Sequence, residues 1–284
     1  MPFGKITILG VGLIGASFGL AARKEGLCGH IAGFGRNEEN LKKAKERGII
    51  DSYDLDPSAA SAGADLVMLS TPVGNFLELV RRCAGSFKKG AVVTDAGSVK
   101  GGLVREIDAL MPSGVHYVGG HPIAGSDRSG IEYANAELFR NAKCIVTPTP
   151  GSDAVAIRTV TDMWNALGSR VIRMEPEAHD RVFAAVSHFP HLLAYAMINT
   201  VADVDPSYLE FGGQGFRDTT RIAASSPEIW RDICLLNKDN ILDLILVFQK
   251  KLDILSRHLR AADSVSLEKE LERARTLREG IGQG

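Results

Sequence analysis

The sequence has few cysteines, and they are not spaced for a shared function. Cys28, Cys83, Cys144 and Cys234 are scattered over 284 residues without a C-x-x-C pair. This argues against a disulfide framework or a zinc site and fits a reducing cytosol. The net charge is also close to zero, because the sequence contains 33 Lys and Arg and 34 Asp and Glu residues. A chain with a net charge of -1 has no global attraction to nucleic acid or to an anionic membrane, so neither is expected as a partner.

A leader sequence and a long apolar run are also missing. Residues 1–5 lead directly into an apparent strand and leave no room for a signal peptide. The apolar run between Asp243 and Lys250 is shorter than a membrane span. There is no internal repeat and no low-complexity segment. We therefore expect a cytoplasmic enzyme with a small-molecule substrate, and a chain of this length usually forms two domains.

What the sequence does contain is a glycine-rich turn between its first strand and first helix. Residues 5–9 are apolar enough for a buried strand, and the segment Gly10-Val11-Gly12-Leu13-Ile14-Gly15 follows. In dinucleotide-binding folds the first glycine makes the turn, the second admits the pyrophosphate and the third packs helix against strand. The helix N-terminus favours the anion. We expect a dinucleotide to bind at Gly10, Gly12, Leu13, Ile14 and Gly15.

The expected second strand ends without an acidic residue. An NAD site usually carries Asp or Glu there to bind the ribose, but residues 30–34 are followed by Gly35-Arg36-Asn37. A small residue followed by a cation leaves room for a 2′-phosphate and attracts it. This favours NADP over NAD. Alternatively, Arg36 is a solvated loop residue and the backbone alone holds the ribose.

Strand and helix signals alternate up to residue 174. Further strands are expected at 65–70, 91–95, 116–118, 144–147 and 170–173, and helices at 38–47, 75–84, 99–110 and 153–167. The alternation predicts an α/β fold, with an N-terminal Rossmann-type doubly wound sheet over residues 1–174. Ligands of such sheets bind beyond the carboxyl ends of the strands. Thr71 and Pro72 are therefore expected at the cofactor.

Residues 175–284 show helical periodicity only, which predicts an all-α dimerisation domain. The expected helix 177–202 contains Pro190, which removes one backbone hydrogen bond and should kink it. Three glycines within 211–217 predict a flexible loop that leads to a cationic site. The expected helix 227–262 has apolar residues on several sides, and on a chain this small they indicate a homodimer interface.

Two side chains are candidates for catalysis or substrate binding from their residue type and sequence neighbours alone. His121 follows two glycines and precedes Pro122, so a loop is expected to aim its imidazole at a fixed point. Histidine suits a general base, although His121 could also be a bystander in a surface turn. Arg221 precedes apolar residues and could bind a carboxylate as a fork. His188 and His191 have no third ligand at suitable spacing, so no metal site is expected.

Taken together, the motifs resemble the prephenate/arogenate dehydrogenase family of tyrosine biosynthesis. The resemblance covers nearly the whole chain and rests on residues 10–15, 95–100, 120–125, 187–191 and 215–221. It implies an oxidoreductase that oxidatively decarboxylates arogenate, prephenate or both. In that reaction His121 takes the C4 hydroxyl proton while hydride leaves for the nicotinamide.

The resemblance also implies roles for other residues. Ser98 would hydrogen-bond His121 or the C4 oxygen, and Arg221 would bind a substrate carboxylate. The remaining family positions in or near the substrate pocket are His191, Arg217, Asp218 and Trp230. Helical domains of the family intertwine as a dimer. No fused chorismate mutase and no C-terminal regulatory ACT domain are expected.

Asp127 bears on the choice of substrate. Arogenate has an ammonium group where prephenate has a ketone, and a carboxylate at Asp127 could reach that end of the substrate. A charge-assisted hydrogen bond would favour arogenate. Alternatively, Asp127 caps the turn over residues 128–130 and does not contact the substrate.

Two other functions fit parts of the sequence. One is a β-hydroxyacid dehydrogenase or imine reductase of the same plan, although such enzymes have no need of a His-Pro loop with paired arginines. The other is a non-enzymatic NADP-sensing regulator, which would need no base at His121.

Overall fold

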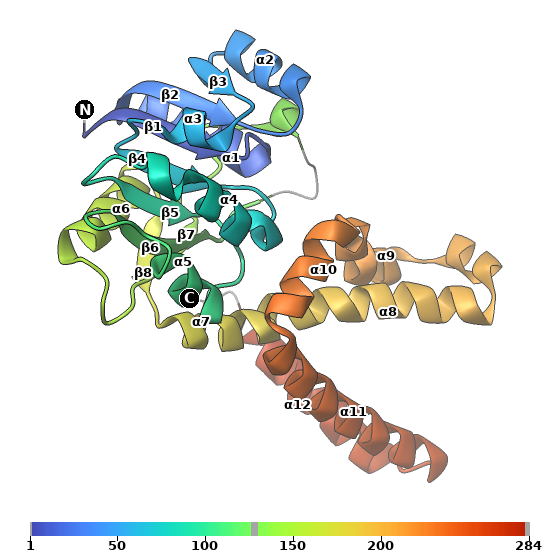
Figure 1. Ribbon diagram of the computed structural model, residues 1–284. Helices are drawn as coiled ribbons and strands as arrows, with labels where there is room; N and C mark the ends of the chain where they lie inside the picture. Colours follow the sequence, from blue (N-terminus) through green and yellow to red (C-terminus); the bar gives the residue numbers. More distant parts are fainter. Residues whose placement is uncertain (1, 126–129, 282–284) are drawn as a thin grey trace. The chain divides into compact units, whose positions relative to one another are not determined.

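A mostly parallel β-sheet and the helices that cover it belong to the larger of two compact units. The computed structural model describes residues 2–125 and 130–281 (Figure 1). Residues 1–238 form one unit and residues 239–284 the other, and each is described by itself. The strands are β1 (Phe3–Leu9), β2 (Cys28–Phe34), β3 (Ser52–Asp54), β4 (Leu66–Leu69), β5 (Val92–Asp95), β6 (His116–Pro122), β7 (Lys143–Thr147) and β8 (Arg170–Arg173).

The strand order confirms the doubly wound α/β prediction. The sheet runs β3-β2-β1-β4-β5-β6-β7-β8, and all neighbouring strands are parallel except the antiparallel pair β6 and β7. Every residue of β4 and β5 is buried, as expected for parallel strands covered on both faces. The helices that connect the strands of the sheet are α1 (Leu13–Lys24), α2 (Glu38–Glu46), α3 (Pro57–Ser61), α4 (Phe76–Cys83), α5 (Gly101–Asp108) and α6 (Ala154–Ala166).

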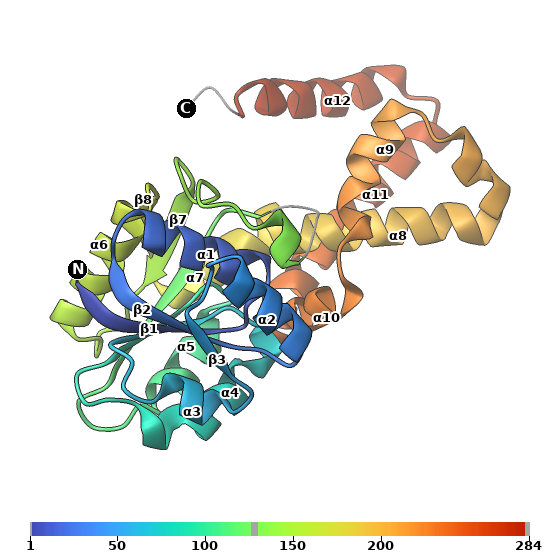
Figure 2. The same cartoon turned by 90° about the horizontal axis from the view of Figure 1, so that it is seen from above.

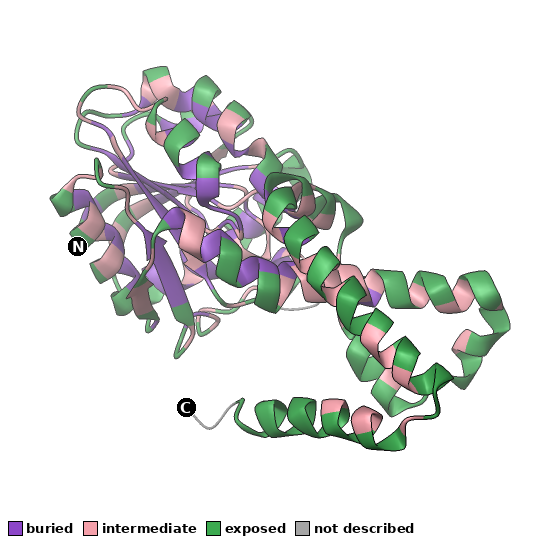
Figure 3. Cartoon of the chain, turned by 90° about the horizontal axis from the view of Figure 1, so that it is seen from below, coloured by how far each residue is buried: buried purple, intermediate pink, exposed green. Residues whose placement is uncertain are grey.

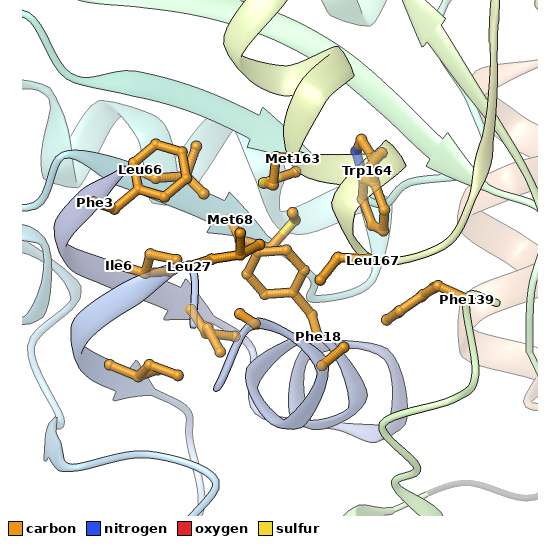
Figure 4. Packing of buried hydrophobic residues seen from close by; sticks show 14 of the residues in the cluster. Phe3, Ile6, Phe18, Leu27, Leu66, Met68, Phe139, Met163, Trp164 and Leu167 are labelled. Atoms are coloured by element: carbon orange, nitrogen blue, oxygen red, sulfur yellow. The ribbon is translucent and has the colours of Figure 1, made fainter. Parts of the chain in front are cut away.

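The two faces of the sheet carry separate hydrophobic cores. Helices α1 and α6 pack on one face and α3, α4 and α5 on the other (Figure 2). On the first face, the ring of Trp164 lies 5.8 Å from that of Phe18 and 5.2 Å from that of Phe139, centroid to centroid (Figure 4). Fully burying an aromatic or aliphatic side chain of this size contributes about 1.5–3 kcal/mol. These cores therefore hold the carboxyl edge of the sheet in place.

Strand β6 differs from the sequence prediction, because it continues through the expected His121 loop. Its first half pairs with β5, and from Gly119 to Pro122 it pairs with β7. The glycines serve close packing rather than a loop. A Cβ on Gly119 would lie 2.4 Å from Thr147 Oγ1, and one on Gly120 would lie 2.7 Å from the Asp95 carbonyl oxygen. His121 is consequently held in a strand.

The first unit ends in α7 (Pro176–Phe183), α8 (Phe189–Val204), α9 (Gln214–Thr220) and α10 (Pro227–Leu236). The irregularity expected at Pro190 is a π-helical turn over Ala184–His188, just before Pro190 in the first turn of α8. The expected loop around Arg217 is the helix α9, which includes Gly215, whereas Gly212 and Gly213 precede the helix. Short 3-10 turns lie at Val73–Asn75, Ala84–Ser86, Ile131–Tyr133, Pro206–Phe211 and Arg221–Ala224.

Exposure separates α8–α10 from the sheet. The strands are largely buried, whereas exposed and half-buried residues prevail on these helices (Figure 3). The continuous helical stretch Pro176–Val204 is long and apolar enough to cross a membrane by length and composition alone. This is weak evidence for a span, because soluble proteins contain such helices. Here His179, Asp180 and His188 on this stretch are buried in the first unit.

The second unit consists of α11 (Lys238–Arg260) and α12 (Ser264–Glu279). Asp263 caps α12 by accepting a hydrogen bond from the Ser266 amide at 3.1 Å. Lys251 and Glu270 link the two helices at 3.8 Å. Large apolar side chains of this unit are exposed, namely Leu242, Leu246, Val247, Leu252, Leu259, Val265, Leu271 and Leu277. That pattern suits a surface that another subunit covers.

Candidate active site

The glycine-rich turn has the geometry that a dinucleotide needs. Gly10 adopts a φ of +111°, which L side chains rarely adopt. No atom lies within 4 Å of a Cβ built on Gly12, so the space above this residue is open. A Cβ on Gly15 would lie 2.2 Å from the Gly10 carbonyl oxygen, so only glycine lets α1 pack here. With α1 beginning at Leu13, its free amides face the turn.

A cavity of about 370 Å³ adjoins this turn. The sequence candidates Gly10, Gly12, Arg36, Thr71 and Pro72 all line it. Leu13, Ile14 and Gly15 open α1 beside it. The rest of its lining is Val11, Phe34, Gly35, Asn37, Asn40, Leu41, Ser70, Asn75, Glu78, Leu79 and Arg82. The residues directly after β2 are Gly35, Arg36 and Asn37, so a cation stands where NAD sites usually have a carboxylate.

The topology brings the predicted chemistry to the edge of the sheet that holds this cavity. Strands β1, β4 and β5 are parallel neighbours, and β6 runs parallel beside β5. Their carboxyl ends therefore share one edge, which carries the glycine turn, Thr71, Ser98 and His121.

His121 is half-buried and fixed by a second histidine. Its Nδ1 lies 2.8 Å from His179 Nε2, and His179 Nδ1 lies 2.8 Å from Asp180 Oδ1. The ring of Phe183 packs against both imidazoles, with centroid distances of 4.8 Å and 4.4 Å. Burial lowers the pKa of His121 well below its ordinary value, and the charge of Lys100 lowers it further. His121 is therefore neutral near pH 7, as a base must be.

A buried ion pair lies next to β6, the strand that carries His121. Lys100 Nζ contacts Asp95 Oδ1 at 2.6 Å, and both side chains are almost completely buried. Asp95 also accepts hydrogen bonds from the Tyr117 hydroxyl at 2.6 Å and the Gly97 amide at 2.7 Å. Lys100 Nζ donates to the Gly97 carbonyl at 2.7 Å. The pair thus fixes the turn that carries Ser98.

Further side chains connect this turn to the helices. Asn237 Nδ2 donates to the Asp180 carbonyl at 2.9 Å and lies 3.0 Å from His188 Nδ1. Burial lowers the pKa of His188 to about 4, and the Ser98 backbone acts in the opposite direction. The His188 ring lies 6.1 Å from that of Trp230. His188 therefore packs between the sheet edge and α10 as a neutral ring.

His191, Trp230 and Arg221 form a second group. The rings of His191 and Trp230 are stacked, with centroids 3.6 Å apart and planes 20° from parallel. His191 Nδ1 donates to the Ser187 carbonyl at 2.9 Å. Burial lowers the pKa of His191, and the charge of Arg221 adds to this effect. The structure thus brings together three residues predicted for the substrate pocket.

The other predicted residues lie apart or outside the described region. Arg217 and Asp218 are exposed on α9, where Arg217 donates to the Gly212 carbonyl at 3.0 Å and Asp218 accepts from Gln214 at 2.8 Å. Asp127 lies outside the described residues. In the described part of the chain, the imidazole of His121 bonds His179 and not Ser98.

Sequence reasoning missed His179 and Asp180. A signal was present, because Pro176, His179, Asp180 and Phe183 follow the helical repeat and are all buried. Two polar residues on the inward face of a helix indicate a buried polar contact. Among residues 2–125 and 130–281, no group of three His, Cys, Asp or Glu side chains could hold a metal ion.

Comparisons with known proteins identify the family. Residues 18–173 match the family model for the prephenate dehydrogenase nucleotide-binding domain, and residues 175–273 match that for the prephenate dehydrogenase dimerization domain. The prephenate dehydrogenase of Bacillus subtilis (strain 168) is 34% identical over 97% of this chain and 76% of its own length.

Two solved structures are similar throughout. Prephenate dehydrogenase from Aquifex aeolicus, in complex with hydroxyphenyl propionate and NAD+, has 37% identity, 99% coverage of both chains and a TM-score of 0.93. Synechocystis arogenate dehydrogenase has 28% identity, 97% coverage of this chain, 99% of its own and a TM-score of 0.81. The β-hydroxyacid dehydrogenase and regulator alternatives therefore give way, and the chain belongs to the prephenate dehydrogenase family of oxidoreductases.

Proposed function

We propose that this chain oxidatively decarboxylates arogenate in preference to prephenate, with NADP as the favoured cofactor and His121 as the base. The observation that carries the proposal is the imidazole of His121, fixed by His179 at the sheet edge that also carries the dinucleotide turn, where burial lowers its pKa. We assign nucleotide binding to residues 1–174, and substrate binding and dimerisation to residues 175–284, in a cytoplasmic homodimer. The exposed apolar side chains of α11 and α12 support the dimer.

The residues present fit a nicotinamide dinucleotide. Open space over Gly12 and the tight packing of Gly15 leave the first amides of α1 facing the pyrophosphate position. When bound, this cofactor supplies the hydride acceptor. Arg36 and the lack of an acid at the three residues directly after β2 support NADP, since an acid there would repel a 2′-phosphate.

The proposed reaction balances without a further reactant. His121 takes the proton of the C4 hydroxyl as the C4–H bond gives up its hydride, and a C4 carbonyl forms. The bond between the ring and its carboxylate then breaks, and carbon dioxide leaves. The electron pair of the broken carbon–carbon bond stays with the ring, which becomes aromatic, and negative charge is placed on the C4 oxygen. His121 returns the proton to that oxygen and is neutral again.

Arg221, His191 and Trp230 are proposed to hold the substrate. Arg221 is exposed and has no ion-pair partner among the described residues, so its guanidinium is available for a bidentate bond to a carboxylate. The stack of His191 on Trp230 forms a flat wall beside it. Arg217 and Asp218 are proposed at the pocket mouth, and Ser98 at the C4 oxygen.

The preference for arogenate rests on Asp127. A carboxylate that follows the His121 strand can pair with the ammonium that distinguishes arogenate from prephenate. Such a charge-assisted bond contributes about 1.5–3 kcal/mol, or roughly 10–100-fold in kcat/KM.

One steady-state experiment tests the whole proposal by crossing arogenate and prephenate with NADP and NAD. We expect release of carbon dioxide with reduced cofactor, and the highest kcat/KM for arogenate with NADP. His121→Asn should lower kcat by about 10²–10⁴-fold and leave cofactor affinity nearly unchanged. Absence of turnover in all four combinations would refute the function, and a His121→Asn variant within threefold of wild type would refute the base.

A further inference from the structure

Three side chains beneath the sheet edge form a continuous hydrogen-bond chain. Asp180 Oδ1 lies 2.8 Å from His179 Nδ1, and His179 Nε2 lies 2.8 Å from His121 Nδ1. His179 is completely buried and Asp180 is 4% exposed. The same Asp180 oxygen accepts the Lys100 amide at 2.8 Å, and Asn237 donates to the Asp180 carbonyl. Asp180 is thus held on its backbone and on its side chain.

The order of donors and acceptors along this chain is determined by chemistry. A carboxylate only accepts, so His179 Nδ1 carries a hydrogen and donates it to Asp180. Burial is the largest influence on the pKa of His179 and lowers it, so this ring is neutral near pH 7 and its Nε2 is an acceptor. His121 must then donate through Nδ1–H. The nitrogen of His121 that carries the free lone pair is therefore Nε2.

From this geometry we propose that His179 and Asp180 are positioning residues that fix His121 in its Nδ1–H tautomer. The inference rests on the proposed function of His121 and deepens it. His121 Nε2 is then always the atom that takes the substrate proton. When it does so, the imidazolium that forms keeps its Nδ1–H bonded to His179, with the Asp180 carboxylate behind it. Without this chain the imidazole could carry its hydrogen on either nitrogen.

A purely structural role is the competing explanation. Phe183 packs on both rings, and His179 could simply fill space between α7 and the sheet. Lys100, Asp95 and His188 also face this region and influence the titration of His121 or His179. A pH profile alone would therefore mix several groups. The tautomer itself is the property that packing does not determine.

The test is ¹⁵N NMR of the full-length protein with ¹⁵N-labelled histidine rings, near pH 7.5. The His121 signal is assigned by its loss in His121→Asn. We expect Nδ1–H in wild type. Asp180→Ala removes the acceptor that holds the hydrogen on His179 Nδ1, so His179 can take either tautomer and His121 should give a mixture of Nδ1–H and Nε2–H. His179→Phe keeps an aromatic ring and removes the acceptor, so it should give a mixture.

Kinetics of the same variants complete the test. Asp180→Ala and His179→Phe should lower kcat by about 10²-fold, with the substrate KM and the cofactor Kd within about threefold of wild type. His179→Gln restores an acceptor and should recover part of kcat. Phe183→Leu, the packing control, should keep the Nδ1–H tautomer. Thermal melts verify that each variant is folded.

The two proposals fail separately. An Nε2–H signal for His121 in the wild-type protein, or an unchanged tautomer in Asp180→Ala, overturns the inference whatever the activity. Equal losses of kcat in His179→Gln and His179→Phe would likewise assign His179 to packing. If instead wild type turns over neither arogenate nor prephenate, the proposed function fails, while the NMR result still decides the tautomer.

Discussion

Replacing Lys100 by Met tests how the buried ion pair supports the site. The side chain of Asp95 is 0% exposed, so its charge has no access to water. Lys100→Met keeps most of the aliphatic volume and removes the cation that contacts Asp95 at 2.6 Å. The hydrogen bonds from Tyr117, Gly97 and Gly120 remain, but none of these donors carries a charge. The variant therefore leaves a negative charge buried without a counter-ion.

The expected cost is large for one side chain. Breaking a buried pair by removing one partner destabilises a protein by about 3–5 kcal/mol. For a chain of this size, about 2–4 °C of Tm is lost per kcal/mol, so a decrease of roughly 6–20 °C is expected. The exposed pair Arg23–Asp51, at 2.9 Å with side chains 42% and 34% exposed, offers a matched control. Arg23→Met should cost about 0–1 kcal/mol, because water screens such pairs.

Urea unfolding followed by circular dichroism measures both variants. The midpoint should fall clearly for Lys100→Met and hardly at all for Arg23→Met, with similar m-values. A loss of less than about 1 kcal/mol in Lys100→Met would refute the view that Asp95 depends on this cation. The pH profile gives a second measurement. The charge of Lys100 lowers the pKa of His121, so its removal should raise that pKa and move the acidic limb of kcat/KM to higher pH.

Three further changes test the proposed pockets. Arg221→Ala should raise the substrate KM strongly, and Arg221→Lys should restore it only in part, since an ammonium cannot form the bidentate bond of a guanidinium. An effect on NADP affinity alone would show that Arg221 binds the cofactor and not the substrate. Gly35→Asp should shift preference toward NAD, and its Cβ fits, since the nearest atom is Leu41 Cδ2 at 3.4 Å; a wild-type preference for NAD would contradict the role of Arg36. Asp127→Asn should reduce the arogenate-to-prephenate ratio of kcat/KM about 10–100-fold, and an unchanged ratio would make Asp127 structural.

The nucleotide-binding half was the more predictable part from sequence, because its signals are local. The glycine turn lies between β1 and α1 as expected, and the apolar runs at β4 and β5 mark buried parallel strands. The short elements β3 and α3 were missed, since β3 has 3 residues and α3 has 5. Elements of that length carry too little periodicity to be recognised.

The candidate site was less predictable, because its contacts depend on packing between distant segments. The glycines before His121 suggested a loop, but their neighbours Thr147 and Asp95 lie far away in sequence and hold them in β6. The contact between His121 and His179 spans 58 residues. Nothing in the local sequence of either histidine specifies the other. Residue types at one position can therefore suggest a base, but only the fold shows what orients it.

The π-helical turn at Ala184–His188 gives the surrounding helix two different directions of contact. The buried residues of this helix include His179, Asp180, Phe183 and Ala184, and the next buried residue is His188, whereas Ser187 is half-buried. A π-turn accommodates one extra residue, and each residue of an α-helix turns it by about 100°. The extra residue thus rotates the side-chain positions after the turn relative to those before it. In the proposed mechanism, the helix before the π-turn positions the base through His179, and the helix after it contacts the substrate through His191. A single-residue deletion in this turn would leave both histidines in the sequence but turn one of them away from the proposed active site.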